Sequence, residues 1–300
     1  MLIEAPLRKS IEVKPLIAAG ADLFYAGVLS KEKINNRHNT ILHQFSDFND
    51  FGLAVKKAHY FGKRVFLTLN GTLISVQDCI EQVEKAVECG VDGFIITNLV
   101  MIDIIRKLDP TSTIYLSVLV SAFNSQSIKF YLKEGVKGLC LPRNLSLENI
   151  EQILSHLPKL EVATFVSGNC SNTQTVCRLH GMAAKEPIYM NEGGFGEFVC
   201  EGWCDNHCSL IDSELKSYLN RRKWCPLCQL SQLKKAGVIN LKIEGRSLDT
   251  LDKIAKVKHI KSALNAMEHL SSDEYVVYCK MLYRQRYGEE CKQNNCYYHD

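Results

Sequence analysis

The stretch Ala19-Gly20-Ala21-Asp22-Leu23-Phe24-Tyr25-Ala26-Gly27-Val28 decides the expected fold. A glycine just past a helical run ends the helix in a left-handed conformation and turns the chain back toward a sheet. The apolar run that follows predicts a short strand over 22–28. Three similar signatures, each before another candidate strand, are Cys89-Gly90-Val91-Asp92, Glu134-Gly135-Val136-Lys137 and Ala236-Gly237-Val238-Ile239.

Eight candidate strands alternate with segments of helical apolar spacing, such as Ser75–Cys89 and Ser146–Leu157. The strands are Leu2–Pro6, Asp22–Val28, Arg64–Asn70, Gly93–Asn98, Ile114–Val120, Gly138–Pro142, Leu160–Gly168 and Leu241–Glu244. This alternation predicts βαβ units and a parallel sheet. No glycine-rich phosphate fingerprint follows the first strand, so the α/β class is read as a (β/α)8 TIM-like barrel rather than an open doubly wound sheet.

The regular alternation stops after the seventh predicted strand. Residues 168–235 are therefore expected to form a cysteine-rich insertion at the carboxyl-end face of the barrel, where active sites of such barrels lie. The barrel with this insertion is predicted to span 1–270, ending in a helix over 249–270. Residues 271–300 are predicted to be a C-terminal tail that packs on or near the barrel.

The composition is that of an ordinary globular protein, with 46% apolar and 23% charged residues in a chain of 300. A net charge of +3 is small for a dedicated nucleic-acid binder. No run of 18 apolar residues predicts a membrane span. No basic region followed by a long apolar one opens the chain, so a cytoplasmic protein is expected.

The cysteine count of 13 is unusual for such a chain. In a reducing compartment, cysteines favour metal binding or catalysis over disulfides. Seven cluster in the insertion: Cys170, Cys177, Cys200, Cys204, Cys208, Cys225 and Cys228. Four thiolates can hold a [4Fe–4S] or [2Fe–2S] cluster. The alternative is a zinc site made by four cysteines, or by three cysteines with His207 as the remaining ligand.

A second candidate site lies at the barrel mouth. Side chains alternate in direction along Leu241–Glu244, so Lys242 and Glu244 point into the barrel if their neighbours face the helices. Glu244, with Arg246 just above it, is a candidate acid/base or substrate clamp. Arg143, at the end of the sixth strand, adds a guanidinium, and two such groups suit a dicarboxylate or phosphate. The alternative is a structural network that closes the barrel.

Four polar residues at or just after strand ends have two interpretations: Asn70, Asn98, Ser117 and Asn124. They either line a pocket or cap the following helices, as Asn and Ser often do.

A basic run, Arg221-Arg222-Lys223, stands directly before Trp224. Such a run either contacts RNA phosphates while the indole stacks on a base, or is a solvated face. A Cys–His protease pair using His180 or His207 is conceivable, but no Gly-x-Ser-x-Gly or His-Glu-x-x-His pattern accompanies it.

The segment Cys225–Arg246, with Ala236-Gly237-Val238 and Leu241-Lys242-Ile243-Glu244-Gly245-Arg246, resembles the signature of peptidase family U-32. The chain is similar to this family over roughly 1–265. Further matches are Ala19–Gly27, Gly62–Asn70 and Leu141–Glu148. Cys170 and Cys177 match the first two family cysteines. Cys200 and Cys204 match its later pair, in which three residues lie between the cysteines, and Cys225 matches a further family cysteine.

The resemblance implies a cluster-binding barrel whose [4Fe–4S] ligands are Cys170, Cys177, Cys200 and Cys225. Cys204, Cys208 and Cys228 are the alternates, and zinc is the alternative metal. Relatives assist oxygen-independent hydroxylation of ubiquinone precursors or hydroxylate bases of ribosomal and transfer RNA, some with oxygen from prephenate. The expected function is thus an oxygen-independent hydroxylase or related redox enzyme acting on RNA or a small molecule.

Two other functions remain open. The chain could be a metal-stabilised, non-catalytic subunit of a hetero- or homo-oligomeric complex, because some relatives act in pairs. The second is the collagenase-like peptidase activity from which the family takes its name.

Overall fold

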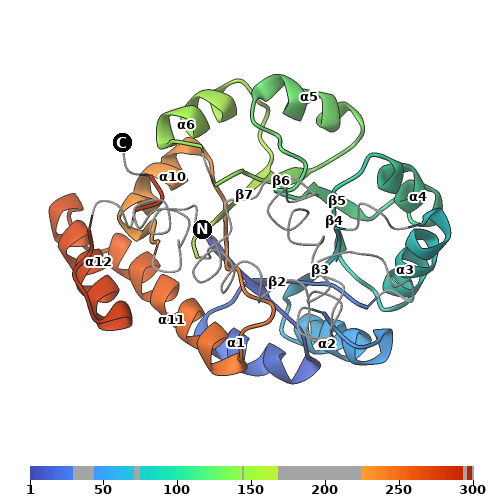
Figure 1. Ribbon diagram of the computed structural model, residues 1–300, viewed down its shortest axis with the longest axis horizontal. Coiled ribbons are helices and arrows are strands. Elements are labelled where there is room, and N and C mark those ends of the chain that lie inside the picture. The colour runs from blue at the N-terminus through green and yellow to red at the C-terminus, as the bar shows by residue number, and fades with distance from the viewer. Residues whose placement is uncertain (30–43, 71–74, 144, 168–223, 293–295, 299–300) are drawn as a thin grey trace, which may run out of the picture.

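The computed structural model describes residues 1–29, 44–70, 75–143, 145–167, 224–292 and 296–298. Eight parallel strands close into a barrel in chain order, as predicted (Figure 1). They are β1 (Leu2–Pro6), β2 (Leu23–Ala26), β3 (Arg64–Leu69), β4 (Gly93–Ile96), β5 (Thr113–Leu116), β6 (Gly138–Cys140), β7 (Glu161–Phe165) and β8 (Asn240–Lys242). Pairing of β1 with β8, Glu4 opposite Lys242, closes the ring.

Helices between the strands form the outer layer (Figure 1). They are α1 (Val13–Ala19), α2 (Phe48–Tyr60), α3 (Val76–Glu88), α4 (Val100–Leu108), α5 (Ser125–Lys133), α6 (Leu147–Ser155) and α10 (Leu230–Ala236), with short 3-10 turns η1 (Ser10–Glu12) and η4 (Leu227–Gln229). Ser75 and Ser146 cap α3 and α6 by accepting backbone N–H bonds, which fixes where these helices begin.

The glycine of each repeated signature has the expected left-handed backbone. Gly20, Gly90, Gly135 and Gly237 have φ between +78° and +114°. Gly20 and Gly237 directly follow the last residues of α1 and α10. An L side chain rarely adopts this conformation, so glycine is what lets each helix end and the next strand begin.

The main hydrophobic core lies between the strands and the helices. Phe24, Leu67, Phe94 and Leu241, one from each of four strands, are fully buried there. Burial of such side chains supplies the main driving force for folding. Inside the barrel, charged pairs lie among apolar and aromatic side chains such as Leu23, Phe66 and Ile95.

Several strands are shorter than the sequence predicts, and they lose residues mostly at their carboxyl ends. The predicted strand over 22–28 pairs only as Leu23–Ala26, and that over 160–168 as Glu161–Phe165. Gly27 and Val28 leave the sheet, and Val28 pairs instead in an isolated bridge with Phe45. Apolar character continues past the last ladder bond because Val28 is still buried in the main hydrophobic core.

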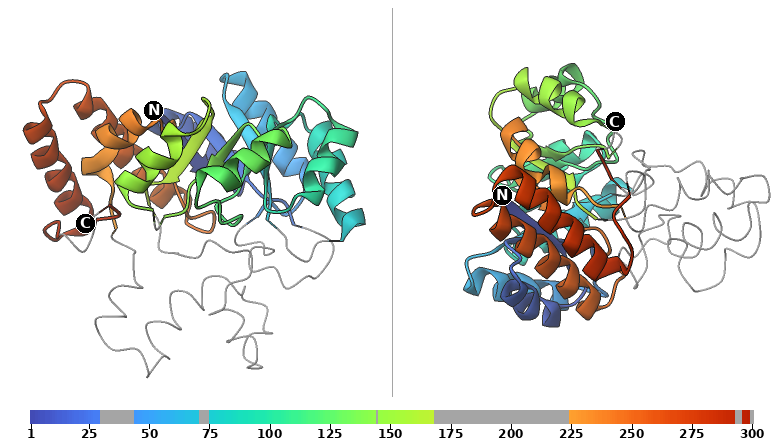
Figure 2. Two further views of the ribbon diagram at one scale, coloured as in Figure 1. Left: turned by 90° about the horizontal axis from the view of Figure 1, so that it is seen from above. Right: turned by 90° about the vertical axis from the view of Figure 1, so that its left-hand side faces the viewer.

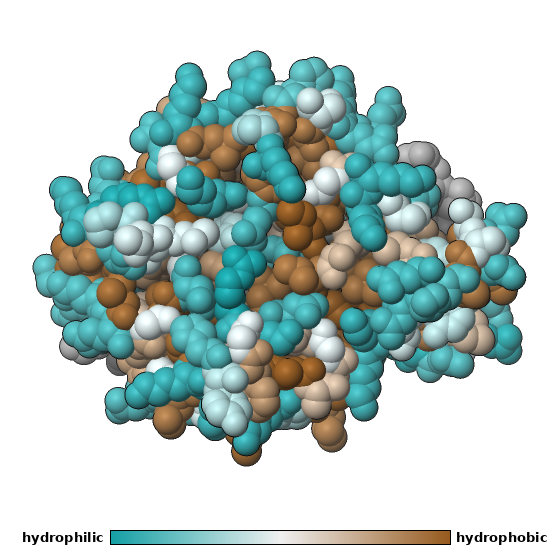
Figure 3. Space-filling model, turned by 180° about the vertical axis from the view of Figure 1, so that it is seen from behind, coloured by the Kyte–Doolittle hydropathy of each residue, from teal (hydrophilic) through white to brown (hydrophobic). Residues whose placement is uncertain are grey.

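Two helices follow β8 in the described chain, and the first of them completes the outer layer of the barrel by packing on α1 and β1. Helix α11 (Thr250–Met267) returns along β1, and α12 (Ser272–Tyr287) lies against α11 (Figure 2). Residues 296–298 then reach the barrel, where the Tyr298 hydroxyl lies 2.9 Å from Thr164 Oγ1 of β7. Among the described helices, none is long and apolar enough to span a bilayer. The face in Figure 3 intersperses hydrophilic and hydrophobic residues.

Candidate functional site

An ion pair joins two of the predicted site residues at the mouth of the barrel. Arg143, just after β6, places Nη2 2.6 Å from Glu244 Oε2, just after β8. The arginine side chain is 4% exposed and stacks 3.8 Å from the centroid of the Phe165 ring, whereas the glutamate side chain is 31% exposed. The Ser167 hydroxyl accepts the Glu244 backbone N–H. The mouth therefore presents a reachable carboxylate held by a buried guanidinium.

Arg246, the third predicted residue, occupies a slot beside β2 and β3. Its Nη1 donates to Thr68 Oγ1 at 3.0 Å, and that hydroxyl donates to the Ala26 carbonyl at 2.7 Å. A Cβ on residue 27 would lie 2.5 Å from Arg246 Nη1 and 2.9 Å from Gln44 Oε1. The slot exists because residue 27 is glycine.

Tyr25 lies among these three residues, and the sequence interpretation missed it. Its hydroxyl donates to the Ile243 carbonyl at 2.8 Å. Burial raises the pKa of Tyr25 well above its usual range, and the charges of Arg246, Glu244 and Arg143 also act on it. The inward alternation of β2 is the signal that could have identified it.

Beneath the mouth, Lys242 forms a buried ion pair with Glu4, which joins β8 to β1 inside the barrel. Its Nζ lies 3.7 Å from the centroid of the Tyr25 ring. The interpretation that Lys242 points inward is confirmed by these contacts. Barrels of this kind usually fill their interior with branched apolar layers, so a charged pair here is unusual.

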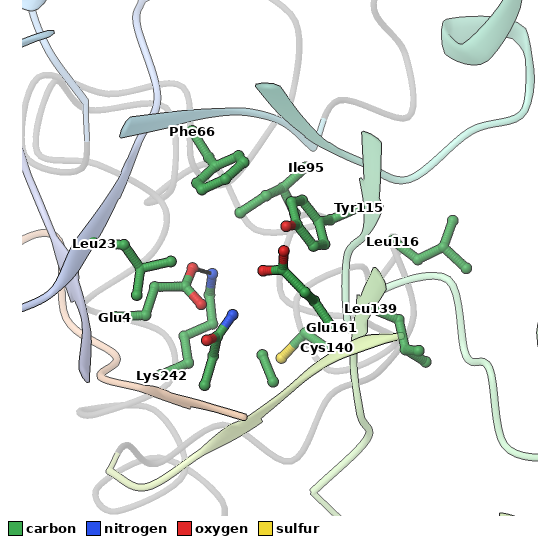
Figure 4. A pocket seen from close by; sticks show the side chains of 12 residues that line it. Glu4, Leu23, Phe66, Ile95, Tyr115, Leu116, Leu139, Cys140, Glu161 and Lys242 are labelled. Carbon is green, nitrogen blue, oxygen red and sulfur yellow. Dashed lines mark hydrogen bonds and ion pairs between the residues drawn. The ribbon is translucent and has the colours of Figure 1, made fainter. Parts of the chain in front are cut away.

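A third pair lies toward the amino ends of the strands, where Arg64 Nη2 is 3.1 Å from Glu161 Oε2. Figure 4 shows the Tyr115 hydroxyl directed toward the Glu161 carboxylate. The cavity between this pair and the Lys242–Glu4 pair measures about 20 Å³, the size of one water molecule. Cys140 lines it, and burial raises the pKa of its thiol to about 12, so that sulfur stays protonated near neutral pH.

Two cysteines of the predicted metal set lie in the described chain. Cys225 is half-buried, and its pKa is raised to about 12, mainly by burial. The pKa of Cys228 is lowered to about 7, mainly by a hydrogen bond from the Cys279 thiol of α12. Cys291 and Cys296 add to the electrostatic surroundings of Cys225. The sequence had not connected these C-terminal cysteines with the Cys-Pro-Leu-Cys turn.

The other predicted ligands, Cys170, Cys177, Cys200, Cys204 and Cys208, lie outside the described residues, as do His180, His207 and the basic run. Within the ranges that are described, no three His, Cys, Asp or Glu side chains converge in a metal-binding group.

Of the four polar residues at strand ends, Asn124 caps the helix that follows it, whereas Asn98 and Ser117 bond within turns. The Asn98 and Asn124 amide oxygens accept the backbone N–H groups of Val100 and Ser127, and Ser117 Oγ accepts that of Leu119. Asn70 differs, because its Oδ1 is buried without a hydrogen-bond partner in the described chain.

The sequence and fold match known proteins over most of the chain. The model of the family described as peptidase family U32 matches residues 9–295. The tRNA hydroxylation protein P of Escherichia coli K12 is 30% identical over 190 residues, which are 62% of this chain and 39% of that protein. The 23S rRNA 5-hydroxycytidine C2501 synthase of the same strain is 25% identical over 260 residues, 82% of this chain and 36% of that protein.

A third relative, tRNA hydroxylation protein P1 of Bacillus subtilis 168, is 23% identical over 255 residues, 81% of this chain and 58% of that protein. The chain thus spans less than two thirds of the length of each of these relatives. Among solved structures, oxaloacetate acetylhydrolase aligns with a TM-score of 0.50 and 11% identity over 94% of this chain and 89% of that one. That likeness concerns the barrel fold alone.

Proposed function

The chain belongs to peptidase family U32, and from this premise we propose that it serves the oxygen-independent hydroxylation of a base in RNA, using an iron–sulfur cluster. The observation that carries the proposal is the 30% identity with a tRNA hydroxylation protein over 190 residues. The match with an rRNA hydroxycytidine synthase over 82% of the chain points to the same substrate class.

The cofactor of the proposal is a [4Fe–4S] cluster held by Cys170, Cys177, Cys200 and Cys225. The fit can be judged at Cys225, whose half-buried sulfur sits at the start of a Cys-Pro-Leu-Cys turn and accepts the Leu227 backbone N–H at 3.5 Å. That donor favours the thiolate, the form that binds metal, whereas burial alone raises the pKa of the thiol. The residue type and the N–H donor fit a cluster ligand, since a bound metal would itself keep the buried sulfur deprotonated. When bound, such a cluster supplies single-electron transfer.

The mouth supplies the substrate contacts of the proposal. The Glu244 carboxylate, reachable from solvent and fixed by Arg143, holds or accepts a proton at Oε. The guanidinium groups of Arg246 and Arg143 suit an anion, and a small carboxylate co-substrate is the natural candidate. Arg246 already donates to a buried hydroxyl, so its orientation is set before any ligand arrives.

The test of the activity is genetic and chemical. Deletion of the gene in the native host should remove a nucleoside heavier by one oxygen from digests of tRNA or rRNA, measured by mass spectrometry. The wild-type gene should restore it, whereas Glu244→Gln should leave on the order of 1% or less. An unchanged nucleoside profile after deletion would refute RNA hydroxylation.

The cofactor has its own test. Anaerobic purification should yield a brown protein with iron and sulfide, and Cys225→Ala should lose most of that iron, since ligands and folding are coupled. Cys79→Ala, which removes a thiol buried in α3, is the matched control and should keep it. A colourless wild-type protein with stoichiometric zinc would contradict the iron–sulfur assignment, and Cys228→Ala losing iron in place of Cys225→Ala would move the ligand by one turn.

A role as a metal-stabilised, non-catalytic subunit of a larger complex is the second candidate. Co-purification from the native host under anaerobic conditions, followed by size measurement, distinguishes the two. A monomer that restores the modified nucleoside to RNA by itself would exclude the subunit role.

A further inference from the structure

Residues 296–298 meet the turn that carries Cys225. The backbone of Cys296 pairs with that of Cys225 in an isolated parallel bridge. The next residue, Tyr297, packs edge-on against the Trp224 indole, with ring centroids 5.6 Å apart and planes at 84°. Tyr297 is buried, and Trp224 packs against the main hydrophobic core. The proposed cluster ligand is thus held through its own backbone and through the side chain of the residue before it.

The same three residues are attached to the barrel wall. The Tyr298 hydroxyl lies 2.9 Å from Thr164 Oγ1 of β7, and both side chains are buried. The ring centroids of Tyr297 and Tyr298 are 6.3 Å apart. Strand β7 leads toward Cys170, which follows Thr164 by six positions in the sequence. Residues 296–298 therefore join two stretches of chain that carry or lead to proposed cluster ligands.

On its other side, the turn is fixed by the helices. Tyr275 of α12 donates to the Leu227 carbonyl at 2.8 Å, and Leu230 of α10 is fully buried. These contacts anchor the residues after Cys225, whereas the bridge with Cys296 restrains Cys225 itself. A ligand residue that is already held in place loses little conformational freedom when the metal binds.

We propose that residues 296–298 form a clasp that positions Cys225 for the cluster, by tying its turn to β7. This role rests on the proposed function, because the cluster is part of it. It belongs to residues that lie beyond 9–295, the part of the chain that the family model matches. In this arrangement Cys296 acts through its backbone, and its sulfur is not a ligand.

The first experiment measures the iron bound by the anaerobically purified protein and the rate at which a chelator removes it. Tyr297→Leu removes the ring that packs on Trp224 and should speed iron loss about 10- to 100-fold, as loss of a group that supports a metal ligand does. Tyr297→Phe keeps the ring, and its rate should lie much closer to that of the wild type. Tyr298→Phe removes the hydroxyl that meets Thr164 and should speed the loss roughly 2- to 10-fold.

Two control variants show which part of the clasp matters. Cys296→Ala removes the sulfur but keeps the backbone pairing, so it should retain iron as the wild type does. Tyr283→Phe removes a different buried phenol hydroxyl, which donates to Glu289 at 3.4 Å within the C-terminal part but outside the clasp. Its rate of iron loss should equal that of the wild type.

Electron paramagnetic resonance of the reduced protein separates positioning of Cys225 from general stability. A change in how Cys225 meets the iron should alter the spectrum of the Tyr297→Leu protein that retains its cluster, because the surroundings of the ligand sulfurs set the electronic properties of such clusters. A variant whose fold is merely less stable would unfold at a lower urea concentration and keep the wild-type spectrum. Tyr283→Phe should keep that spectrum.

The outcomes distinguish the clasp from the cluster on which it rests. Equal rates of iron loss and equal spectra in Tyr297→Leu and the wild type would overturn the clasp and leave the cluster assignment standing. Loss of iron from Cys296→Ala as complete as that from Cys225→Ala would also overturn it, because Cys296 would then be a ligand. A wild-type protein without iron would overturn both. If Tyr297→Leu does not fold, the rate in Tyr298→Phe relative to Tyr283→Phe decides the question.

Discussion

At the scale of single residues, the position of Arg246 at the mouth depends on a glycine that leaves space for it. Glu244 and the two arginines are the groups with chemistry, but the space for Arg246 comes from the missing Cβ of Gly27. Thr68 then fixes the direction of that guanidinium. The position of the Arg246 guanidinium thus depends on Gly27, a residue without a side chain.

Gly27→Ala should therefore impair the site more than the fold. The added methyl would lie 2.5 Å from Arg246 Nη1, and overpacking of this kind costs about 1–3 kcal/mol of stability. The guanidinium should move to relieve it, and the hydroxylated nucleoside in a complemented deletion strain should fall on the order of 10- to 100-fold. Mass spectrometry and the melting temperature measure the two effects.

Gly52→Ala in α2 is the control for that substitution. Its Cβ would meet the Cys89 sulfur at 3.1 Å, far from the mouth, and a helical site favours alanine. The amount of hydroxylated nucleoside in this variant should equal that in the wild type. Wild-type product in Gly27→Ala would show that the position of Arg246 does not limit the reaction.

At the scale of elements, the C-terminal helices connect the outside of the barrel to its mouth. Helix α11 packs along β1, α12 packs on α11, and Tyr275 and Cys279 of α12 both contact the Cys-Pro-Leu-Cys turn. His259 of α11 is half-buried near Arg286 of α12, and its buried Nε2 has no hydrogen-bond partner in the described chain. A histidine in such a place is neutral in the folded protein.

The packing of α12 on α11 should consequently weaken in acid. Burial lowers the pKa of His259 to about 4, and Arg286 contributes to this lowering, from the ordinary value of 6.5. Between about pH 6.5 and pH 4 the unfolded chain binds a proton that the folded chain excludes, so stability falls as the pH falls through this window. The loss is at most about 3 kcal/mol. Denaturant unfolding at pH 7 and pH 4.5 measures it.

His259→Gln should show a smaller loss over the same interval, because the titrating group is gone. The exposed His156, at the end of α6, provides the comparison, and His156→Gln should follow the wild type. Equal pH dependence in all three proteins would assign acid sensitivity to other groups.

At the scale of the whole molecule, three ion pairs lie along the barrel interior and join strands that are distant in sequence. Arg64–Glu161 lies toward the amino ends, Lys242–Glu4 joins the first and last strands, and Arg143–Glu244 is at the mouth. Buried charges are costly unless paired, so the Lys242–Glu4 pair, which is buried on both sides, can form only when the first and last strands meet.

The Lys242–Glu4 pair, which joins the first and last strands, tests whether pairing of buried charges stabilises the closed barrel. Lys242→Met leaves the Glu4 carboxylate, 4% exposed, without its cation and should destabilise the fold by about 3–5 kcal/mol in urea unfolding. The double variant Lys242→Met/Glu4→Leu should recover most of that loss. Arg64→Met, which breaks the half-exposed pair with Glu161, should cost only about 0–1 kcal/mol. If the double variant is as unstable as Lys242→Met, the loss of stability does not come from the unpaired Glu4 carboxylate.

The sequence by itself determined the barrel, because the signals for it are local. Glycines at helix ends, apolar periods and serine caps act within a few residues, and the eight strands and their order followed from them. It also predicted that Glu244, Arg246 and Arg143 lie at the mouth, since strand ends gather at one face of a barrel. The inward direction of Lys242 followed from strand alternation alone.

Only the tertiary structure decided which distant residues meet. The partnership of Glu4 with Lys242 spans 238 positions, and that of Thr164 with Tyr298 spans 134. Three other arrangements also join distant parts of the chain. Gly27 lies beside Arg246, and Trp224 packs against Tyr297. Cys225 lies near the C-terminal residues Cys279, Cys291 and Cys296. Such contacts depend on how strands close and where a tail returns in space, and no local period or spacing along the chain encodes that geometry.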